Sequence, residues 1–219
     1  MRTSRLEAFS DGVLAIIITI MVLELKIPEG HDFTDLVHET GWGLLTYLLS
    51  FVYVGIYWVN HHHMFHLVQR VQGGVLWVNL ALLFVLSLFP FTTAWMDESG
   101  FAHIPVIVYG LNLMAGSITY VILQTLIIRQ QGPDSPLRKA VGRDRKGKVA
   151  PFFYVAGILS ALFIDRDGHL GSYIGVGFFI ANALLWFIPD RRIDRVVRDL
   201  EHTQASDPEE ASRPRQPVS

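Results

Sequence analysis

The residues best suited to chemistry stand at the start of the first apolar segment. Arg5, Ser10 and Asp11 directly precede an aliphatic run that reaches Ile20 without a further charge. Charged residues beside or inside a membrane-spanning segment are rare and usually serve a function. The alternative is structural, since Ser10 or Asp11 can cap the helix N-terminus while Asp11 pairs with a neighbouring cation. The two interpretations are compatible.

A single face of the same segment carries Ile16, Thr19, Ile20 and Leu23. At about 100° per residue these positions fall within an arc of roughly 100°, so three bulky aliphatic side chains surround one hydroxyl. Such a face is suited to lining a pore or a binding surface. The alternative is a stripe that faces lipid or the protein core, because aliphatic residues surround the whole helix.

Four histidines occur within six residues at the end of the second apolar segment: His61, His62, His63 and His66. Helical spacing places His62 and His66 on one face, as in a two-histidine metal site. No acidic residue or third ligand stands nearby in the sequence, so we predict no metal site. A network at the membrane surface with carboxylates or carbonyls is favoured instead.

The later segments carry polar residues suited to helix packing. Asn79 is the one amide in a long apolar run, and Pro90 interrupts the same segment, which predicts a kink or an interhelical hydrogen bond. No nucleotide-binding loop, Ser-His-Asp order or zinc-protease motif is present. The absence of cysteine excludes disulfide frameworks, thiolate metal sites and cysteine nucleophiles. We therefore predict neither an enzyme nor a bound cofactor.

The composition indicates where these residues act. Of the 219 residues, 51% are hydrophobic and 12% aromatic, which exceeds what a soluble domain of this size needs. A helix needs about 20 apolar residues to cross the hydrocarbon layer. Six segments approach that length: Phe9 to Ile27, Gly43 to Trp58, Val75 to Trp95, Ile104 to Ile128, Val149 to Ile164 and Leu170 to Ile188. The sequence thus predicts an all-α polytopic membrane protein with six transmembrane helices.

Basic residues are distributed unevenly between these segments. All but two of the 18 Lys and Arg residues fall in the N-terminus, the loops after the second and fourth segments, and the C-terminal tail. The exceptions are Lys26 and Arg166. Loops rich in Lys and Arg remain in the cytoplasm, so both termini are predicted to be cytoplasmic. A cleaved signal peptide is disfavoured, since Asp11 and Glu24 flank the first segment and no small-residue cleavage site follows.

The chain divides into a transmembrane domain, residues 1–190, and a cytoplasmic tail, residues 191–219. The tail is basic at first and then polar and Pro-containing without apolar periodicity, so we expect its end to be disordered. The basic stretch from Gly132 to Lys148 is predicted to lie near anionic lipid headgroups. Membrane lipid is therefore an expected partner, and nucleic acid is not.

The spacing of several of these residues resembles one channel family. The residues are Arg5 followed by Phe9-Ser10-Asp11-Gly12, then Thr19, Trp58 followed by His61-His62 and Phe65, Asn79-Leu80, and Pro90-Phe91. This combination resembles the endolysosomal-type potassium channel family, in particular its bacterial branch, whose signature is the Phe-Ser-Asp-Gly motif. The match covers the first three segments, whereas the last three agree mainly in number and hydrophobicity.

The resemblance implies a homotetramer in a bacterial plasma membrane, with a pore lined by the first helix of each subunit. Animal members carry two six-helix repeats in one chain and pair up, whereas this chain carries one Phe-Ser-Asp-Gly motif. By match to the family, Ile16 forms a hydrophobic constriction, Thr19 a polar ring beside it, and Leu23 a further apolar ring.

The resemblance also implies a network that braces the first helix. Its members are Arg5, Ser10, Asp11 and one of His61 or His62.

The activity implied by the family is passive conduction of cations with modest selectivity for potassium over sodium. Potassium gives up its water more readily at an apolar constriction with a hydroxyl beside it. A proton-coupled transporter, in which Asp11, Glu24 and the histidines titrate, would instead place charges at the midplane, and both acids stand near helix ends. The third hypothesis is a membrane scaffold without transport, which ion flux in liposomes would exclude.

Overall fold

The computed structural model describes residues 3–68, 70–132, 135–142, 145–165 and 168–187, so the predicted tail, residues 191–219, lies outside the described residues. The elements in chain order are α1 (Thr3–Leu23), α2 (Phe33–Asp35), η1 (Leu36–Thr40), α3 (Gly41–His66), α4 (Gly73–Ser87), α5 (Phe89–Glu98), α6 (His103–Gln131), α7 (Pro136–Val141), α8 (Arg145–Phe163) and α9 (Leu170–Phe187). The element η1 is one turn of π-helix.

The six predicted segments all correspond to apolar helices. Five helical runs are long and apolar enough to cross a bilayer: Thr3–Leu23, Phe33–His66, Gly73–Glu98, His103–Gln131 and Leu170–Phe187. The sixth, Val149–Phe163 within α8, is apolar but shorter. Helices suit a lipid environment because they bond their backbone N–H and C=O groups internally. The prediction of an all-α polytopic membrane protein is confirmed.

The first two spans differ most from their predicted bounds, and the first helix ends at Leu23 rather than Ile27. The first helix begins at Thr3 rather than Phe9, so its polar residues belong to the helix and do not precede it. The second span runs from Phe33 to His66, well beyond the predicted range of Gly43 to Trp58. Hydropathy marks the part of a helix that lies in hydrocarbon, and polar turns extend both helices past that part.

The third span is interrupted next to Pro90. The helix α4 ends at Ser87 and α5 begins at Phe89, with Leu88 between them. Proline lacks an N–H, and its ring clashes with the carbonyl of the preceding turn. The Leu88 N–H therefore turns back to the Val85 carbonyl (3.2 Å), and helical bonding resumes from the Thr92 N–H to the Leu88 carbonyl (3.0 Å). The interruption predicted from this proline is present.

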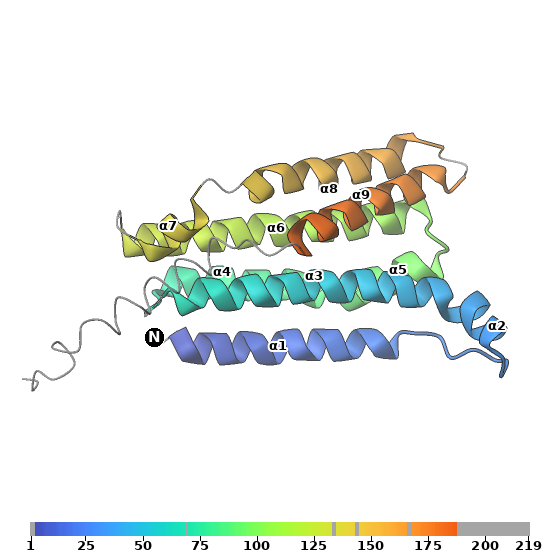
Figure 1. Cartoon of the computed structure of the whole chain (residues 1–219), viewed down its shortest axis with the longest axis horizontal. Coiled ribbons are helices and arrows are strands. Elements are labelled where there is room, and N and C mark those ends of the chain that lie inside the picture. The colour runs from blue at the N-terminus through green and yellow to red at the C-terminus, as the bar shows by residue number, and fades with distance from the viewer. Residues whose placement is uncertain (1–2, 69, 133–134, 143–144, 166–167, 188–219) are drawn as a thin grey trace, which may run out of the picture.

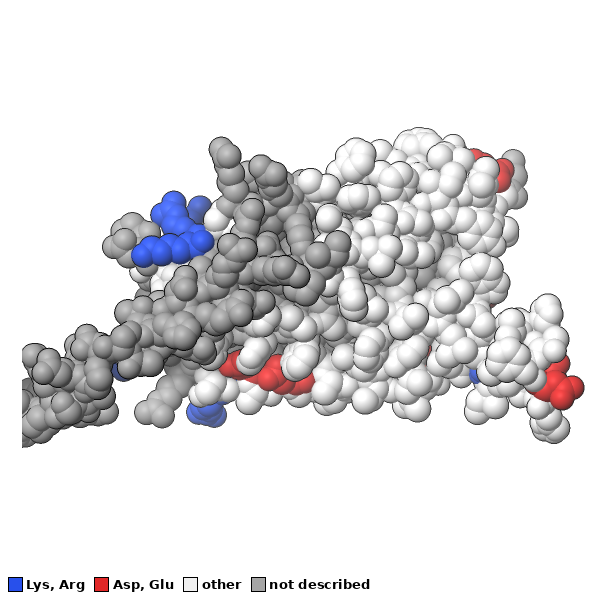
Figure 2. Space-filling view, in the orientation of Figure 1, with Lys and Arg blue, Asp and Glu red and all other residues white. Residues whose placement is uncertain are grey.

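The spanning helices lie roughly along the long axis of the molecule (Figure 1). The helix α1 packs against α3, α4 and α5, while α6 packs against α4, α5 and α8, and α8 pairs with α9. The N-terminus and α7 lie at one end, and α2 lies at the other (Figure 1). We call the end with α7 the basic end, because Figure 2 shows basic side chains over α7 and acidic ones at α2.

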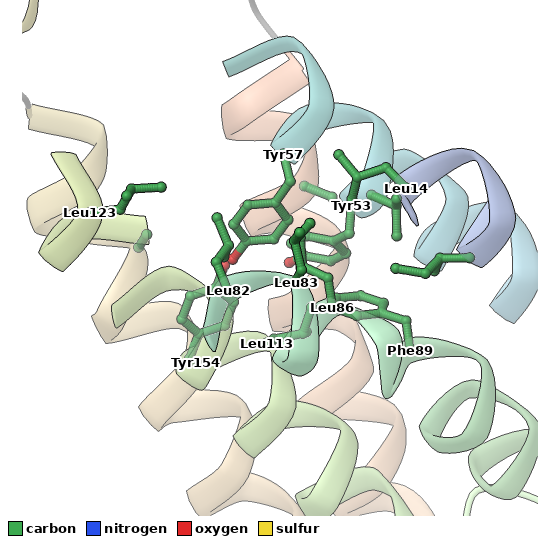
Figure 3. Close-up of a cluster of buried hydrophobic side chains, with 14 of the residues drawn as sticks. Leu14, Tyr53, Tyr57, Leu82, Leu83, Leu86, Phe89, Leu113, Leu123 and Tyr154 are labelled. Atoms are coloured by element: carbon green, nitrogen blue, oxygen red, sulfur yellow. The ribbon is translucent and has the colours of Figure 1, made fainter. Parts of the chain in front are cut away.

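Large apolar side chains fill the space between the helices, as Figure 3 shows for leucines and aromatic residues of α1, α3, α4 and α6. Where α6, α8 and α9 meet, glycines allow close approach. A Cβ on Gly175 would lie 2.7 Å from the Gly157 carbonyl oxygen, and one on Gly110 would lie 2.5 Å from the Phe179 ring. Helices in lipid associate largely through such close packing of small residues.

Candidate functional site

The helix α1 has one buried and one exposed side. Its buried residues recur every three or four positions and face the neighbouring helices of the same chain: Leu6, Ser10, Leu14, Ile17 and Met21. On another side, Ile16 is 57% exposed, Leu23 is 79% exposed, and Thr19 is exposed between them. The face that helical spacing grouped together is therefore the outward face of α1.

The Thr19 hydroxyl is held in one orientation by its own helix. Its oxygen lies 3.0 Å from the carbonyl oxygens of both Ala15 and Ile16, so the single hydroxyl proton is directed back into the helix. A hydroxyl oxygen also carries acceptor lone pairs, and these remain available on the exposed side. The outward face of α1 thus combines apolar side chains with one oxygen that accepts and does not donate.

A chain of buried hydrogen bonds anchors the opposite side of α1. The Asn79 amide of α4 donates to the Ser10 hydroxyl oxygen (3.0 Å), and Ser10 donates its proton to the Leu6 carbonyl (2.9 Å). The Asn79 oxygen lies 2.8 Å from Nε2 of His61 on α3. Because an amide oxygen only accepts, Nε2 of His61 is the donor. The buried chain therefore ties α1, α3 and α4 together.

Two exposed contacts join α1 to α3 beside the buried chain. The Trp58 indole N–H donates to Asp11 Oδ1 (3.0 Å), and His62 Nδ1 lies 2.6 Å from Glu7 Oε1. In addition, the rings of His62 and His66 lie 6.2 Å apart between centroids, as their shared helix face predicts. Four side chains thus form two contacts between α1 and α3, one helical turn apart.

The structure brings together most of the residues in the predicted bracing network. Ser10, Asp11 and both His61 and His62 all contact a neighbouring helix or a residue of the network. Arg5 is exposed and forms no ion pair with another described residue. Asp11 pairs with an indole and not with a cation. Neither Ser10 nor Asp11 caps α1, since both lie inside it.

Sequence reasoning missed Glu7, and it left the partners of Trp58 and Asn79 open. The sequence did contain a signal for the contacts of Glu7 and Trp58. Glu7 and Asp11 are four residues apart, as are Trp58 and His62, so each pair shares one helix face. Glu7 and Asp11 on one helix can therefore face His62 and Trp58 on an antiparallel neighbour.

Comparison with known proteins identifies the family. A potassium channel of Chryseobacterium sp. is 48% identical over 199 residues, which cover 91% of this chain and 100% of that protein. The chain belongs to the TMEM175 family. The sequence model of this family, described as the endosomal/lysosomal potassium channel TMEM175, matches residues 5–90. The resemblance inferred from the sequence is thereby confirmed at the level of the family.

The solved structures agree with this assignment. The crystal structure of a lysosomal potassium-selective channel TMEM175 homolog from Chamaesiphon minutus matches with a TM-score of 0.70 at 28% identity, covering 85% of this chain and 96% of that one. The human endosomal/lysosomal proton channel TMEM175 is 34% identical over 113 residues, which are 46% of this chain and 22% of that protein. TMEM175 relatives are thus ion channels and not enzymes.

Within the TMEM175 family the region matched by the family model coincides with the site. Residues 5–90 contain α1, α3 and α4, which supply the outward face of α1 and the side chains that anchor it. The structural likeness extends over most of the remaining helices as well.

Proposed function

We propose that this protein is a potassium-permeable cation channel in which four copies surround one axis and α1 of each copy lines the pore. The observation that carries this function is the two-sided character of α1. One side is tied to α3 and α4 by the Ser10–Asn79–His61 chain, while the side with Ile16, Thr19 and Leu23 is left exposed. A helix that lines a pore needs both properties.

Permeation in this arrangement depends on partial dehydration of the ion. Four Ile16 side chains form the narrowest, apolar ring, Thr19 adds a ring of oxygens next to it, and Leu23 adds a further apolar ring. Potassium loses its hydration shell at lower cost than sodium, so an apolar ring with acceptor oxygens beside it favours potassium modestly. The exposed oxygen of Thr19 is suited to this role because its proton is directed away.

The charge distribution supports an orientation in the bacterial plasma membrane. At the basic end, Arg129, Arg138 and Lys139 are exposed, and Figure 2 shows the basic side chains over α7. Basic segments remain on the cytoplasmic side. The N-terminus lies at the same end (Figure 1), so the proposed orientation has cytoplasmic termini, with the acidic α2 outside.

A proton-coupled transporter is less favoured by the placement of the titratable groups. Such transporters bind at the midplane, next to broken helices. Here Glu7 and Asp11 stand in the second and third turns of α1, on the N-terminal side of its aliphatic run, and Glu24 follows its last residue. The two carboxylates of α5, Asp97 and Glu98, stand at its C-terminal end, away from the interruption at Leu88, and α4 has none.

Ion flux from liposomes tests the function directly. The purified full-length protein is reconstituted into vesicles loaded with potassium, and efflux is measured with sodium, or a large organic cation, outside. We expect electrogenic potassium efflux that needs no pH gradient, smaller sodium flux, and no flux of the organic cation. Flux that requires a proton gradient would indicate a transporter, and absence of flux would indicate a scaffold.

A further inference from the structure

The helix α1 forms one edge of the subunit and has a different neighbour on each side. It contacts α3, α4 and α5, and Figure 1 shows it across these helices from α6, α8 and α9. In the proposed tetramer the α1 edge points to the common axis. The surfaces on either side of α1 then face the two adjacent copies. We call them the α3 flank and the α4–α5 flank.

Polar groups on the α3 flank argue against lipid as its cover. The Trp58 indole and Asp11 meet at the border between α1 and α3, and His62 beside Glu7 is half-exposed. Asp11 stands eight residues after the start of α1, about 12 Å along the helix. Ionisable side chains inside a span face protein or water and not hydrocarbon. This flank therefore needs a protein or aqueous neighbour.

A tetramer around the membrane normal brings together residues that lie at the same depth, because rotation about that axis leaves depth unchanged. Two buried contacts within the subunit show which residues of α3 and the α4–α5 span are level: Ser50 with Thr93 (2.7 Å) and His61 with Asn79 (2.8 Å). Gly55 of α3 and Phe84 of α4 both lie between these two levels. They therefore stand at nearly the same depth, on opposite flanks.

The two flanks are complementary in shape at this depth. A Cβ on Gly55 would meet nothing within 4 Å in its own subunit, whereas Leu48, two turns earlier on α3, is 55% exposed. Gly55 thus leaves a notch in an otherwise bulky face. Phe84 on the other flank is 66% exposed, so its ring protrudes. Helices in lipid associate closely where a small residue receives a large one.

We propose that the α3 flank of each copy packs against the α4–α5 flank of the next copy, with Phe84 of one seated on Gly55 of the other. The inference rests on the proposed function, because the tetramer is part of it. The contact joins two different surfaces, so each copy has two neighbours and the arrangement closes into a ring. The helices α6, α8 and α9 then lie on the outside.

Paired cysteines test this interface, since the natural sequence has none. In Gly55→Cys with Phe84→Cys, each copy can form a disulfide with both neighbours. Mild oxidation of the full-length protein in membranes should give dimers, trimers and tetramers on denaturing gels, and a reducing agent should return them to monomers. Either single variant should stay monomeric, because in the proposed interface neither position meets its own copy.

A pair at unequal depth is the matched control. Trp95 stands eleven residues after Phe84, about 16 Å further along the span, and a disulfide requires Cα atoms about 4.4–6.8 Å apart. Gly55→Cys with Trp95→Cys should therefore stay monomeric. Cross-linking of this pair, or of Gly55→Cys alone, to the same extent as the level pair would overturn the proposal.

Filling the notch gives a second test that needs no cross-link. Gly55→Phe adds a ring where the subunit itself has space, so the chain should fold but lose the tetramer in size-exclusion chromatography with light scattering. Gly177→Phe makes the same change on α9, where a Cβ also meets nothing within 4 Å, and should stay tetrameric. Tetramers of normal size in Gly55→Phe would overturn the proposed contact.

The outcome separates this interface from the proposed function. Monomers in the level pair, together with oxidised dimers of Leu23→Cys on the proposed pore face, would overturn the interface and leave the pore. The full ladder of cross-linked species in vesicles that show no potassium flux would support the interface and overturn the channel.

Discussion

At the scale of single residues, the hydrogen bonds of the polar side chains on α1 indicate a different role for each. Asp11 is occupied by the Trp58 indole and stands away from the face that carries Ile16. Thr19 satisfies its proton within its own helix and leaves an oxygen exposed. A neutral oxygen interacts with a cation more weakly than a carboxylate does, so ions in the proposed pore can pass it without being trapped.

The residues proposed to face the pore, Ile16 and Thr19, give the most specific prediction at this scale. Ile16→Asn wets the apolar ring, so conductance should rise and the potassium-to-sodium permeability ratio should fall toward unity. Thr19→Val removes one oxygen per subunit at nearly constant volume. If the ring of four oxygens as a whole favours potassium over sodium by about 0.4–1.4 kcal/mol, the ratio should fall by about two- to tenfold. Bilayer recordings of relative permeability measure both effects.

Two neighbours on α1 serve as controls for these variants. Ile17 is buried against its own subunit and Ile18 packs partly against the core. Replacing either by Val should leave the permeability ratio unchanged. Wild-type selectivity in correctly assembled Ile16→Asn channels would mean that α1 does not line the pore.

The buried chain predicts that Asn79 matters more for stability than Asp11. Asn79→Leu leaves the donor of His61 without its acceptor in a buried site, which costs about 1–3 kcal/mol. Asp11→Asn keeps an oxygen for the Trp58 indole and should change stability by less than about 0.5 kcal/mol. Thermal melts followed by size-exclusion chromatography rank the two variants. The reverse order would show that the carboxylate charge of Asp11 is what holds α1.

At the scale of helices, the register of α1 against α3 is fixed by opposed pairs. Glu7 contacts His62, and Asp11, one turn later on α1, contacts Trp58, one turn earlier on α3. This is the pattern of antiparallel neighbours, in which a step forward on one helix matches a step backward on the other. These two contacts fix the position of α1 along its axis and its rotation about that axis, and hence which residues face outward.

The existence of the six helices was predictable, because the length and apolar character of a span are set by the bilayer. The grouping of Ile16 and Thr19 on one helix face was also predictable from the helical period, whereas the exposure of that face was not. Pairings such as Asn79 with Ser10 were not, since they depend on which helices are neighbours and on their rotation.

A double-mutant cycle on Glu7→Gln and His62→Gln measures the coupling free energy between these two side chains. His62 is 51% exposed, so solvent screens the contact, and we expect a coupling free energy of about 0.2–1 kcal/mol. His66→Gln is the matched control, because His66 lies one turn further along α3 and does not contact Glu7. The Glu7→Gln and His66→Gln effects should be additive in thermal stability. Coupling of the same size between Glu7 and His66 would indicate a diffuse charge effect in place of a specific contact between Glu7 and His62.

At the scale of the whole molecule, the proposed pore requires a partner for the exposed face of α1. Ile16 and Leu23 are largely uncovered within one chain, and a single copy of six spans does not enclose a channel around them. A pore lined by α1 therefore has to be assembled from several copies, and four copies around one axis are proposed.

The absence of cysteine in the natural sequence makes this assembly directly testable, because one introduced thiol has no background. In the proposed tetramer, Leu23→Cys places four thiols toward the axis, near the α2 end of the pore. Thiolates bind soft divalent ions, so micromolar cadmium should block potassium flux, a chelator should reverse the block, and mild oxidation should produce disulfide-linked dimers on denaturing gels. Met21→Cys places the thiol two residues away, at a position buried in its own subunit, and should show neither block nor dimers. If Met21→Cys responded and Leu23→Cys did not, in tetramers of normal size, α1 would be rotated relative to the proposed axis.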